Sequence, residues 1–523
     1  MKTRIWIGRA GMAALAVGLA AVSSGFANVG GWGSFLGALV VGAGILFGGL
    51  YALRAEVVPR WVVWLTVGAA VLRLGAGALW FAVLPVSGYD TDVQRAGYVM
   101  DDAFRRDQSA WVLAHSDKSL SKAFTDYRNE DQYGGLLFLS AGLYRALGGE
   151  THRPLLIVVV TAAFSALAVA FTWAFARRMF DGTVAGWAAW GVALYPEAVL
   201  LGSSQMREAF MMTLAAAAFY GLARYWQERS WPGLAWVGGA FLLSLPLSPP
   251  LGGILVGMLA VVALALDEGR VIRNWRLWAL LGGLAALVVG GMWLGWGQIA
   301  PRLSLERFSN PLEMVVFWAR HSARWQAYLT RGDSGSVQKL FRNTPDWFNL
   351  PFLLGYGTIR PLLPAALTAW STPIWRFIGV WRALGWTLVL PLLVYAPLRA
   401  VRTPEKRGLA VGLSLAVWAG ILIAAFWGGG DLWDNPRYRV SFVALQMALA
   451  AWALVSYRRA PDPALRVALA LVFGVLVWFT PWYFRRYSPF FKWWPVQDLL
   501  KLIGLGLVTG GGYALWDWAG RKE

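Results

Sequence analysis

A pair of carboxylates stands where a long apolar run ends. Asp90 and Asp92, in the sequence GYDTD at 88–92, follow an apolar run at 61–84 that is long enough to cross a bilayer. A carboxylate at the end of a membrane span, facing water, can take the proton of an incoming hydroxyl group and so serve as a general base. The same aspartates could instead cap a helix, or hold a metal bound to a nucleotide diphosphate. Asp90 and Asp92 are candidate catalytic residues, and Asp90 is favoured because it lies nearer the membrane.

Acidic side chains are concentrated in the segment that these two residues open. Segment 85–132 holds nine of the chain's 28 carboxylates: Asp90, Asp92, Asp101, Asp102, Asp107, Asp117, Asp126, Glu130 and Asp131. The apolar runs on either side make this the boundary between hydrocarbon and water, where acid–base chemistry on a lipid-linked substrate is possible.

A second candidate acid, Glu208, closes the short turn 203–208 between two apolar runs. An acid at the start of a helix is favoured by the helix dipole, so capping alone is one interpretation. The other is a second acidic or hydrogen-bonding group in an outward-facing cavity. Glu197, near the end of the preceding run, is expensive to bury and is expected to line the same cavity.

Basic residues in three places suit an anionic phosphate. Arg437, Tyr438 and Arg439 open a late apolar run after a polar loop that begins at Asp431. Two arginines near a helix start can bind phosphate through charge and backbone N–H groups, although anchoring to lipid headgroups fits as well. Residues two apart cannot share one face of a straight helix, so at least one of these arginines is expected in the loop. Arg207 and Arg360 are predicted helpers.

Further basic residues fit either a lipid ligand or plain membrane anchoring. Arg485, Arg486 and Lys492 are interleaved with aromatic residues, a pattern that suits an anionic lipid substrate or side chains that snorkel to the interface. Arg73, in the middle of the run at 61–84, requires a partner or a cavity.

The composition excludes several classes of site. Cysteine is absent from the 523 residues, so disulfides, thiolate metal sites and cysteine nucleophiles are impossible. Only three histidines are present, which disfavours a histidine-rich metal centre. The net charge of +19 is explained by basic loops at one membrane face, so no nucleic acid is expected as a partner.

The apolar runs predict an all-α, polytopic integral membrane protein with about 14 transmembrane helices, because 58% of the residues are hydrophobic and runs of about 17–25 residues recur. The predicted spans are 8–23, 32–53, 61–84, 154–176, 184–201, 209–226, 232–247, 250–266, 277–297, 377–398, 408–427, 438–456, 465–482 and 496–516. The chain then divides into N-terminal spans at 1–84, a first large outer segment at 85–153, central spans at 154–297, a second large outer segment at 298–376, and C-terminal spans at 377–523.

The distribution of Lys and Arg predicts which segments face the cytoplasm. Basic residues collect in alternate loops on the side of the N-terminus, which places both termini in the cytoplasm and the two large segments outside. The stretches 92–115 and 133–147 are predicted to be interfacial helices, and another is predicted to start at Asn310. The first span also resembles a cleavable signal peptide.

The order of these features resembles the GT-C class of membrane glycosyltransferases, which includes the protein mannosyltransferases and aminoarabinose transferases. The matching part covers roughly 85–230 and the loop at 431–439. The pieces are YDTD at 89–92, FARRMFDG at 175–182, LYP at 194–196 before 203–208, and RYR at 437–439. Many members have one span before the first large loop, whereas three are predicted here, and many have Asp in place of Glu208.

The resemblance implies an inverting transferase of the cell envelope, with its active site on the extracytoplasmic face of a bacterial cytoplasmic membrane. Asp90 or Asp92 would be the base, Glu208 a second catalytic acid, and a polyprenyl-phosphate sugar the donor. The acceptor would be a glycan, lipid or protein outside the cytoplasm. No cofactor is expected, and a divalent metal is neither required nor excluded. A flippase for a lipid-linked sugar, and a polysaccharide polymerase or ligase that uses a diphosphate-linked lipid, stay open as alternatives. The expected absence of a separate soluble C-terminal domain disfavours a diphosphate-linked oligosaccharide donor.

Overall fold

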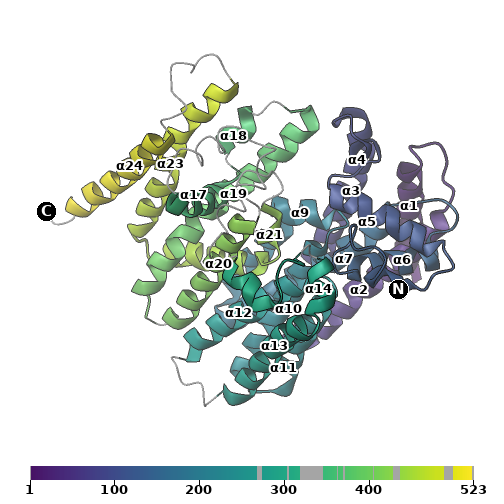
Figure 1. Cartoon of the computed structure of the whole chain (residues 1–523), viewed down its shortest axis with the longest axis horizontal. Coiled ribbons are helices and arrows are strands. Elements are labelled where there is room, and N and C mark those ends of the chain that lie inside the picture. The colour runs from purple at the N-terminus through teal and green to yellow at the C-terminus, as the bar shows by residue number, and fades with distance from the viewer. Residues whose placement is uncertain are drawn as a thin grey trace. The chain divides into compact units, whose positions relative to one another are not determined.

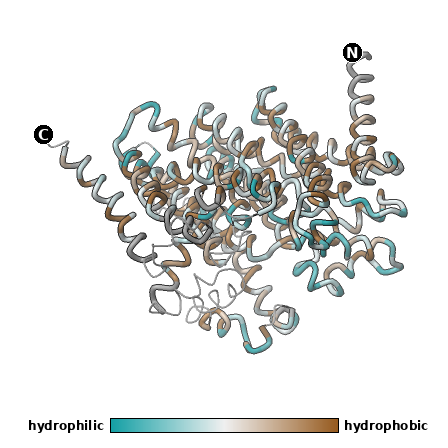
Figure 2. The backbone as a smooth tube through the Cα atoms, turned by 90° about the horizontal axis from the view of Figure 1, so that it is seen from above, coloured by the Kyte–Doolittle hydropathy of each residue, from teal (hydrophilic) through white to brown (hydrophobic). Residues whose placement is uncertain are grey.

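All regular secondary structure in the described residues is helical. The computed structural model describes residues 2–267, 274–302, 305–317, 346–361, 363–368, 371–404, 406–427, 436–487 and 499–520 (Figure 1). Hydrophobic residues run along the helices, and hydrophilic residues gather mainly in the connecting turns (Figure 2). The predicted all-α class is confirmed for this part of the chain.

Seven of these helices are long and apolar enough to cross a bilayer, which makes the chain an integral membrane protein. They are α2 (Trp32–Ala52), α3 (Arg60–Ser87), α7 (Leu155–Met179), α12 (Pro249–Asp267), α13 (Trp275–Leu294), α19 (Pro373–Arg402) and α20 (Arg407–Trp427). An eighth candidate is the pair α8 (Gly182–Leu194) and α9 (Pro196–Gly202), bent by 52° where they meet.

The prediction of fourteen spans is not confirmed. The six other predicted spans do fall on helices, but these are not among the candidates that length and apolarity identify in the described residues. They are α1 (Lys2–Ser23), α10 (Arg207–Glu228), α11 (Trp231–Ser244), α22 (Val443–Arg459), α23 (Ala464–Tyr487) and α24 (Leu499–Ala519).

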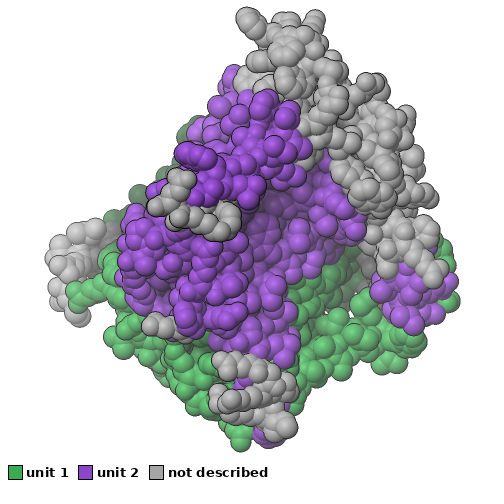
Figure 3. All heavy atoms as spheres, turned by 90° about the vertical axis from the view of Figure 1, so that its left-hand side faces the viewer, with its two compact units in different colours: residues 1–179, 189–257, 276–309 green, residues 180–188, 258–275, 310–523 purple. Residues whose placement is uncertain are grey.

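The chain packs into two compact units, coloured separately in Figure 3. Unit 1 comprises residues 1–179, 189–257 and 276–309, and unit 2 comprises residues 180–188, 258–275 and 310–523.

The core of unit 1 is built around α7. Nearly all of α7 is buried, and it packs against α2, α3 and α10. Small residues allow the close approach: a Cβ at Gly77 of α3 would lie 2.7 Å from the Val158 side chain of α7 and 2.9 Å from the Ser203 carbonyl oxygen. Because α3 is held against α7 in this way, the position at which α3 ends is held as well.

The first large segment of unit 1 forms short helices rather than spans. They are α4 (Asp92–Arg95), α5 (Asp101–Ala114), the 3₁₀ turn η2 (Leu120–Phe124) and α6 (Gly135–Leu147), with another 3₁₀ turn, η1 (Arg54–Glu56), after α2. The helix α5 packs against α6, and α6 matches the short helix predicted at 133–147. Unit 1 also contains α14 (Trp296–Arg302).

The helix predicted to start at Asn310 is present where the structure describes it. Residues 311–317 are helical, and Asn310 Oδ1 accepts a hydrogen bond from the Glu313 backbone N–H at 2.9 Å. The predicted continuation of this helix lies outside the described residues.

Unit 2 is organised around α19, which packs against α20, α22 and α23. It also contains α17 (Asp346–Ile359), α18 (Leu363–Thr368) and the short helix α21 (Pro436–Val440). The helices α23 and α24 lie side by side (Figure 1), and Gly474 and Gly510 bring their backbones together, since a Cβ at either would lie within 3 Å of a carbonyl oxygen of the other helix.

Candidate active site

The acidic turn that ends α3 has a defined backbone. The Gly88 N–H donates to the Leu84 carbonyl oxygen at 2.8 Å, and the Tyr89 N–H donates to the side chain of Gln94. Thr91, not an aspartate, caps α4: its hydroxyl oxygen accepts from the Gln94 N–H at 3.4 Å. The alternative in which Asp90 or Asp92 caps a helix is therefore wrong, and neither carboxylate is needed to hold the turn.

Asp90 and Asp92 are exposed and share one cation. Their side chains are 89% and 83% exposed, and Arg95 lies 3.4 Å from Asp90 Oδ1 and 2.6 Å from Asp92 Oδ1. Ion pairs in water contribute little free energy, so a ligand can displace Arg95 at low cost. The structure thus brings the two predicted carboxylates together in a form that a substrate can reach.

Glu208 lies in a different environment. It is buried in the first turn of α10, where the helix dipole favours an acid. The charges of Arg207, Asp131 and Glu208 act on the buried guanidinium of Arg106. The Arg106 guanidinium donates to the Gln205 carbonyl oxygen at 3.0 Å, and its Nε lies 3.8 Å from Asp131 Oδ2.

The charges in this buried group act on one another. Burial lowers the pKa of Arg106, and the negative charge of Asp131 opposes that shift. Asp131 also accepts the Leu137 N–H at the start of α6, at 2.9 Å. Arg207 is half-buried, with its guanidinium carbon 5.3 Å from the centre of the Tyr133 ring. Glu208 and Arg207 therefore belong to a polar group inside unit 1 that also includes Arg106 and Asp131.

A fully buried carboxylate, Asp107, holds the first large segment together. It accepts hydrogen bonds from the Tyr98 hydroxyl, from the Tyr144 hydroxyl at 2.7 Å and from His152 Nε2 at 2.8 Å. Burial, and the nearby charge of Asp107, raise the pKa of both tyrosines well above its usual value. The ring of Trp111 lies 5.0 Å from that of His152. Asp107 thereby links α5, α6 and the chain entering α7.

Sequence reasoning assigned no role to Arg106, Asp107, Asp131 or His152. For Arg106 and Asp107 the sequence did contain a signal. They are adjacent in an amphipathic helix, and charged side chains are costly to bury unless they are paired. Glu197, predicted to line a cavity with Glu208, is fully buried on α9.

A small cavity of about 30 Å³ lies in the described part of unit 1, between α3, the chain before α5 and the turn that precedes α10. Trp80 and Ser203 line it and are joined by a 3.1 Å hydrogen bond from the indole N–H to the hydroxyl. Neither Glu197 nor Glu208 lines this cavity. It has room for about one water molecule, which is far less than a sugar requires.

Arg73 has a partner that follows from the break between α8 and α9. In a continuous helix the Val192 carbonyl would accept from the N–H of residue 196, but Pro196 has no N–H. The Arg73 Nη2 donates to that carbonyl at 3.2 Å. Gly202 leaves the space, because a Cβ there would lie 2.5 Å from Arg73 Cδ. The buried arginine thus compensates for the proline.

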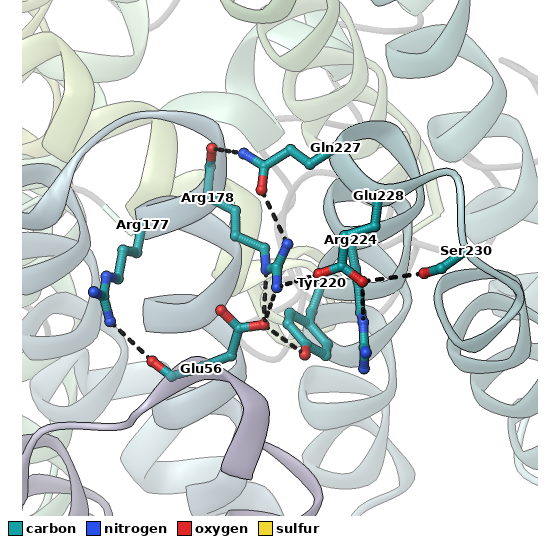
Figure 4. Close-up of polar contacts among 8 residues, drawn as sticks. All are labelled: Glu56, Arg177, Arg178, Tyr220, Arg224, Gln227, Glu228 and Ser230. Atoms are coloured by element: carbon teal, nitrogen blue, oxygen red, sulfur yellow. Dashed lines mark hydrogen bonds and ion pairs between the residues drawn. The ribbon is translucent and has the colours of Figure 1, made fainter.

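Ion pairs and hydrogen bonds hold the C-terminal end of α7 (Figure 4). Arg178 binds the buried Glu56 at 2.6 Å and Glu228 at 2.7 Å, and Tyr220 donates to Glu56 at 2.8 Å. The neighbouring Arg177 donates to the Glu56 carbonyl oxygen at 2.9 Å. The two arginines of the FARRMFDG motif therefore tie η1, α7 and α10 together.

In unit 2, four of the predicted phosphate-binding residues lie in one group. Arg437 Nη2 donates to the Tyr438 hydroxyl at 2.8 Å, and Tyr438 stacks on Trp427. Arg439 Nη1 donates to the Arg360 carbonyl oxygen at 2.7 Å, and its guanidinium lies 3.5 Å from the centre of the Trp386 ring. Both arginines are buried.

The prediction that one of these arginines lies in the loop is wrong, because both belong to α21. This helix is only one turn long, and its two arginines contact different partners, as residues two apart on a helix must. Arg485 and Arg486 lie on α23, whereas Asp431 and Lys492 lie outside the described residues.

No group of three or more His, Asp or Glu side chains is arranged to hold a metal ion in the described ranges. No protein-family model matches the sequence, and no curated protein matches it. Among solved structures, the chain is similar to the archaeal oligosaccharyltransferase AglB from Archaeoglobus fulgidus in complex with an inhibitory peptide and a dolichol-phosphate. The TM-score is 0.43 and the identity 14%, over 85% of this chain and 60% of that one. The chain thus spans less than two thirds of that protein's length.

Proposed function

We propose that the protein is an inverting glycosyltransferase that moves a sugar from a polyprenyl-phosphate donor to an acceptor on the extracytoplasmic face of the membrane. The observation that carries this proposal is the state of Asp90 and Asp92. They are two exposed carboxylates on a turn at the end of a candidate span, and in the described part of the chain both form an ion pair with Arg95. The order of motifs shared with GT-C transferases supports it.

In the proposed reaction Asp90 takes the proton of the acceptor hydroxyl. The acceptor oxygen then bonds to the anomeric carbon of the donor sugar from the side opposite the phosphate. The bond between that carbon and the phosphate oxygen breaks, and polyprenyl phosphate leaves with the electron pair, so the anomeric configuration inverts. Because Asp90 is exposed, it returns the proton to water.

Arg437 and Arg439 are proposed to bind the donor phosphate. Their charge stabilises the negative charge that develops on the leaving oxygen. Trp386 lies against the Arg439 guanidinium and Tyr438 against that of Arg437, and Trp427 stacks on Tyr438. These rings give an apolar setting in which the charge is screened less by water. Glu208, with Arg207 beside it, is proposed as the second acid.

The test uses the full chain in lipid nanodiscs with a panel of polyprenyl-phosphate sugars and mixed glycan, lipid and peptide acceptors. Release of free polyprenyl phosphate is measured by mass spectrometry, and the anomeric configuration of the product by NMR. Inverted product from a monophosphate donor supports the proposal. Consumption of diphosphate-linked donors alone indicates a polymerase or ligase. Transfer of intact lipid-linked sugar across a vesicle membrane, without cleavage, indicates a flippase.

A further inference from the structure

The acidic turn at 88–92 is held by a side chain from the helix that follows it. Gln94 of α4 is buried, and its side-chain oxygen Oε1 accepts a hydrogen bond from the Tyr89 N–H. A glutamine side chain carries one oxygen and one NH₂ group, so the oxygen must face this backbone donor. Tyr89 directly precedes Asp90 in the chain. The bond therefore fixes the backbone one residue before the proposed base.

Gly88 allows the glutamine to come this close. A Cβ at Gly88 would collide with Gln94 Oε1 and would lie 2.5 Å from the Leu84 carbonyl oxygen, which is too close for a Cβ atom. The Gly88 N–H also donates to that carbonyl, at 2.8 Å. A larger residue at this position would displace the end of α3 or the side chain of Gln94. The glycine and the glutamine thus form one arrangement with the last turn of α3.

The residues that follow α4 are anchored by other contacts. Gly97 has a φ of +81°, and a Cβ there would lie 2.8 Å from the Phe81 carbonyl oxygen, so this residue rests directly on the backbone of α3. The hydroxyl of the next residue, Tyr98, donates to the buried Asp107. Loss of the Gln94 contact is therefore expected to loosen the acidic turn without unfolding the first large segment.

We propose that Gln94 is a positioning residue, whose bond to the Tyr89 N–H holds Asp90 where it can take the proton of the acceptor. This inference rests on the proposed function, in which Asp90 is the general base. The Asp90 side chain is 89% exposed, and an ion pair in water, such as that with Arg95, restrains it weakly. The backbone must then supply the order, since a misplacement of about 1 Å can cost on the order of 10²-fold in rate.

The first measurement requires no activity. Hydrogen–deuterium exchange of the full chain in lipid nanodiscs is followed by mass spectrometry in the peptide that contains residues 88–92. Gln94→Met removes the acceptor at similar size, so this peptide should exchange faster while peptides of α5 and α6 do not change. Gln94→Glu keeps an oxygen that can accept from the Tyr89 N–H, and it should restore the exchange of the parent. Unchanged exchange in Gln94→Met would overturn the inference.

The second measurement separates positioning from folding. In Gln94→Met, kcat for release of polyprenyl phosphate should fall about tenfold and donor KM should change little, because the base acts in the chemical step. Gln94→Glu should recover most of the lost kcat. Gln108→Met is the matched control, since Gln108 is exposed on α5, and it should change neither exchange nor kcat. Melting temperatures confirm that each variant is folded.

The result for Asp90 separates this inference from the proposed function. A normal kcat in Gln94→Met, with Asp90→Asn inactive, would overturn the positioning role and leave the base in place. Normal transfer in both Asp90→Asn and Asp92→Asn would reject the base itself, and the positioning role with it, even if the turn exchanges faster in Gln94→Met.

Discussion

Two groups of carboxylates in the same short segment differ in almost every physical respect. Asp90 and Asp92 stand in water and share one surface arginine, whereas Asp107 and Asp131 are buried and accept hydrogen bonds from groups on other elements. A carboxylate in water keeps its lone pairs available to a substrate. A buried carboxylate remains charged only where donors replace its water, so its lone pairs are already committed to the fold. The contacts of the second group assign it to architecture, and the first group is left open to the chemistry proposed for it.

The largest expected effect tests the first half of this comparison. Asp90→Asn should lower the rate of sugar transfer on the order of 10²–10⁴-fold, because it removes the proposed general base. The melting temperature should not change, since the side chain is exposed. Turnover is measured as release of polyprenyl phosphate.

The control for this variant is Asp101→Asn, another exposed acid of the same segment, which pairs with Arg105 at 2.5 Å. It should leave turnover unchanged. Near-normal turnover in both Asp90→Asn and Asp92→Asn would show that neither residue is the general base.

The second prediction concerns a buried acid, for which the expected loss is of stability. Asp107→Ala should destabilise unit 1 by about 3–5 kcal/mol, because three donors lose their buried acceptor. Thermal unfolding of the purified protein, or its yield from membranes, gives the measurement. A melting temperature within a degree of the parent would show that Asp107 does not hold the segment.

The third prediction extends the comparison to unit 2. Arg437→Ala should raise the donor KM about tenfold, as expected for a lost charge-assisted hydrogen bond to phosphate. Arg439 also holds the Arg360 carbonyl and stacks on Trp386, so Arg439→Ala should lower the melting temperature as well. Equal and negligible changes of donor KM in both variants would assign these arginines to headgroup anchoring.

A smaller effect is expected at Glu208. It is predicted to be catalytic, like Asp90, but it is buried near Arg106, as the architectural acids are buried. Glu208→Gln keeps the shape and one acceptor of the side chain, so it should impair turnover by about tenfold, less than loss of the base. Stability should change by less than in Asp107→Ala. A loss of stability with no loss of turnover in the folded fraction would place Glu208 with the architectural acids.

The last prediction tests which side of the membrane two segments of the chain face, and it does not depend on an activity measurement. The chain has no cysteine, so a single cysteine reports its own location. Ser121→Cys, exposed on η2, should react with a membrane-impermeant maleimide added outside the cell, whereas Arg60→Cys, exposed at the start of α3, should not. Labelling in the reverse order would place both groups of acids on the cytoplasmic side and exclude the proposed orientation.

The sequence alone determined the all-helical class, the positions of the apolar helices, the acidic turn after α3 and the cap at Asn310. These depend on local properties: length of apolar runs, proline, and capping side chains within a few residues of one another. The number of spans was not settled by the same means, because helices such as α10 and α22 fall outside the limits of length and apolarity that identify the other candidates.

Only the tertiary structure decided which acids are buried and which arginines have partners. The three donors to Asp107 lie 9, 37 and 45 residues away along the chain, and the carbonyl that accepts from Arg73 lies 119 residues away. No local pattern encodes such pairings, since they arise when helices pack and water is removed from between them. Pro196 shows how the two levels meet. The residue type alone removes a backbone donor, but the fold determines that Arg73 takes its place.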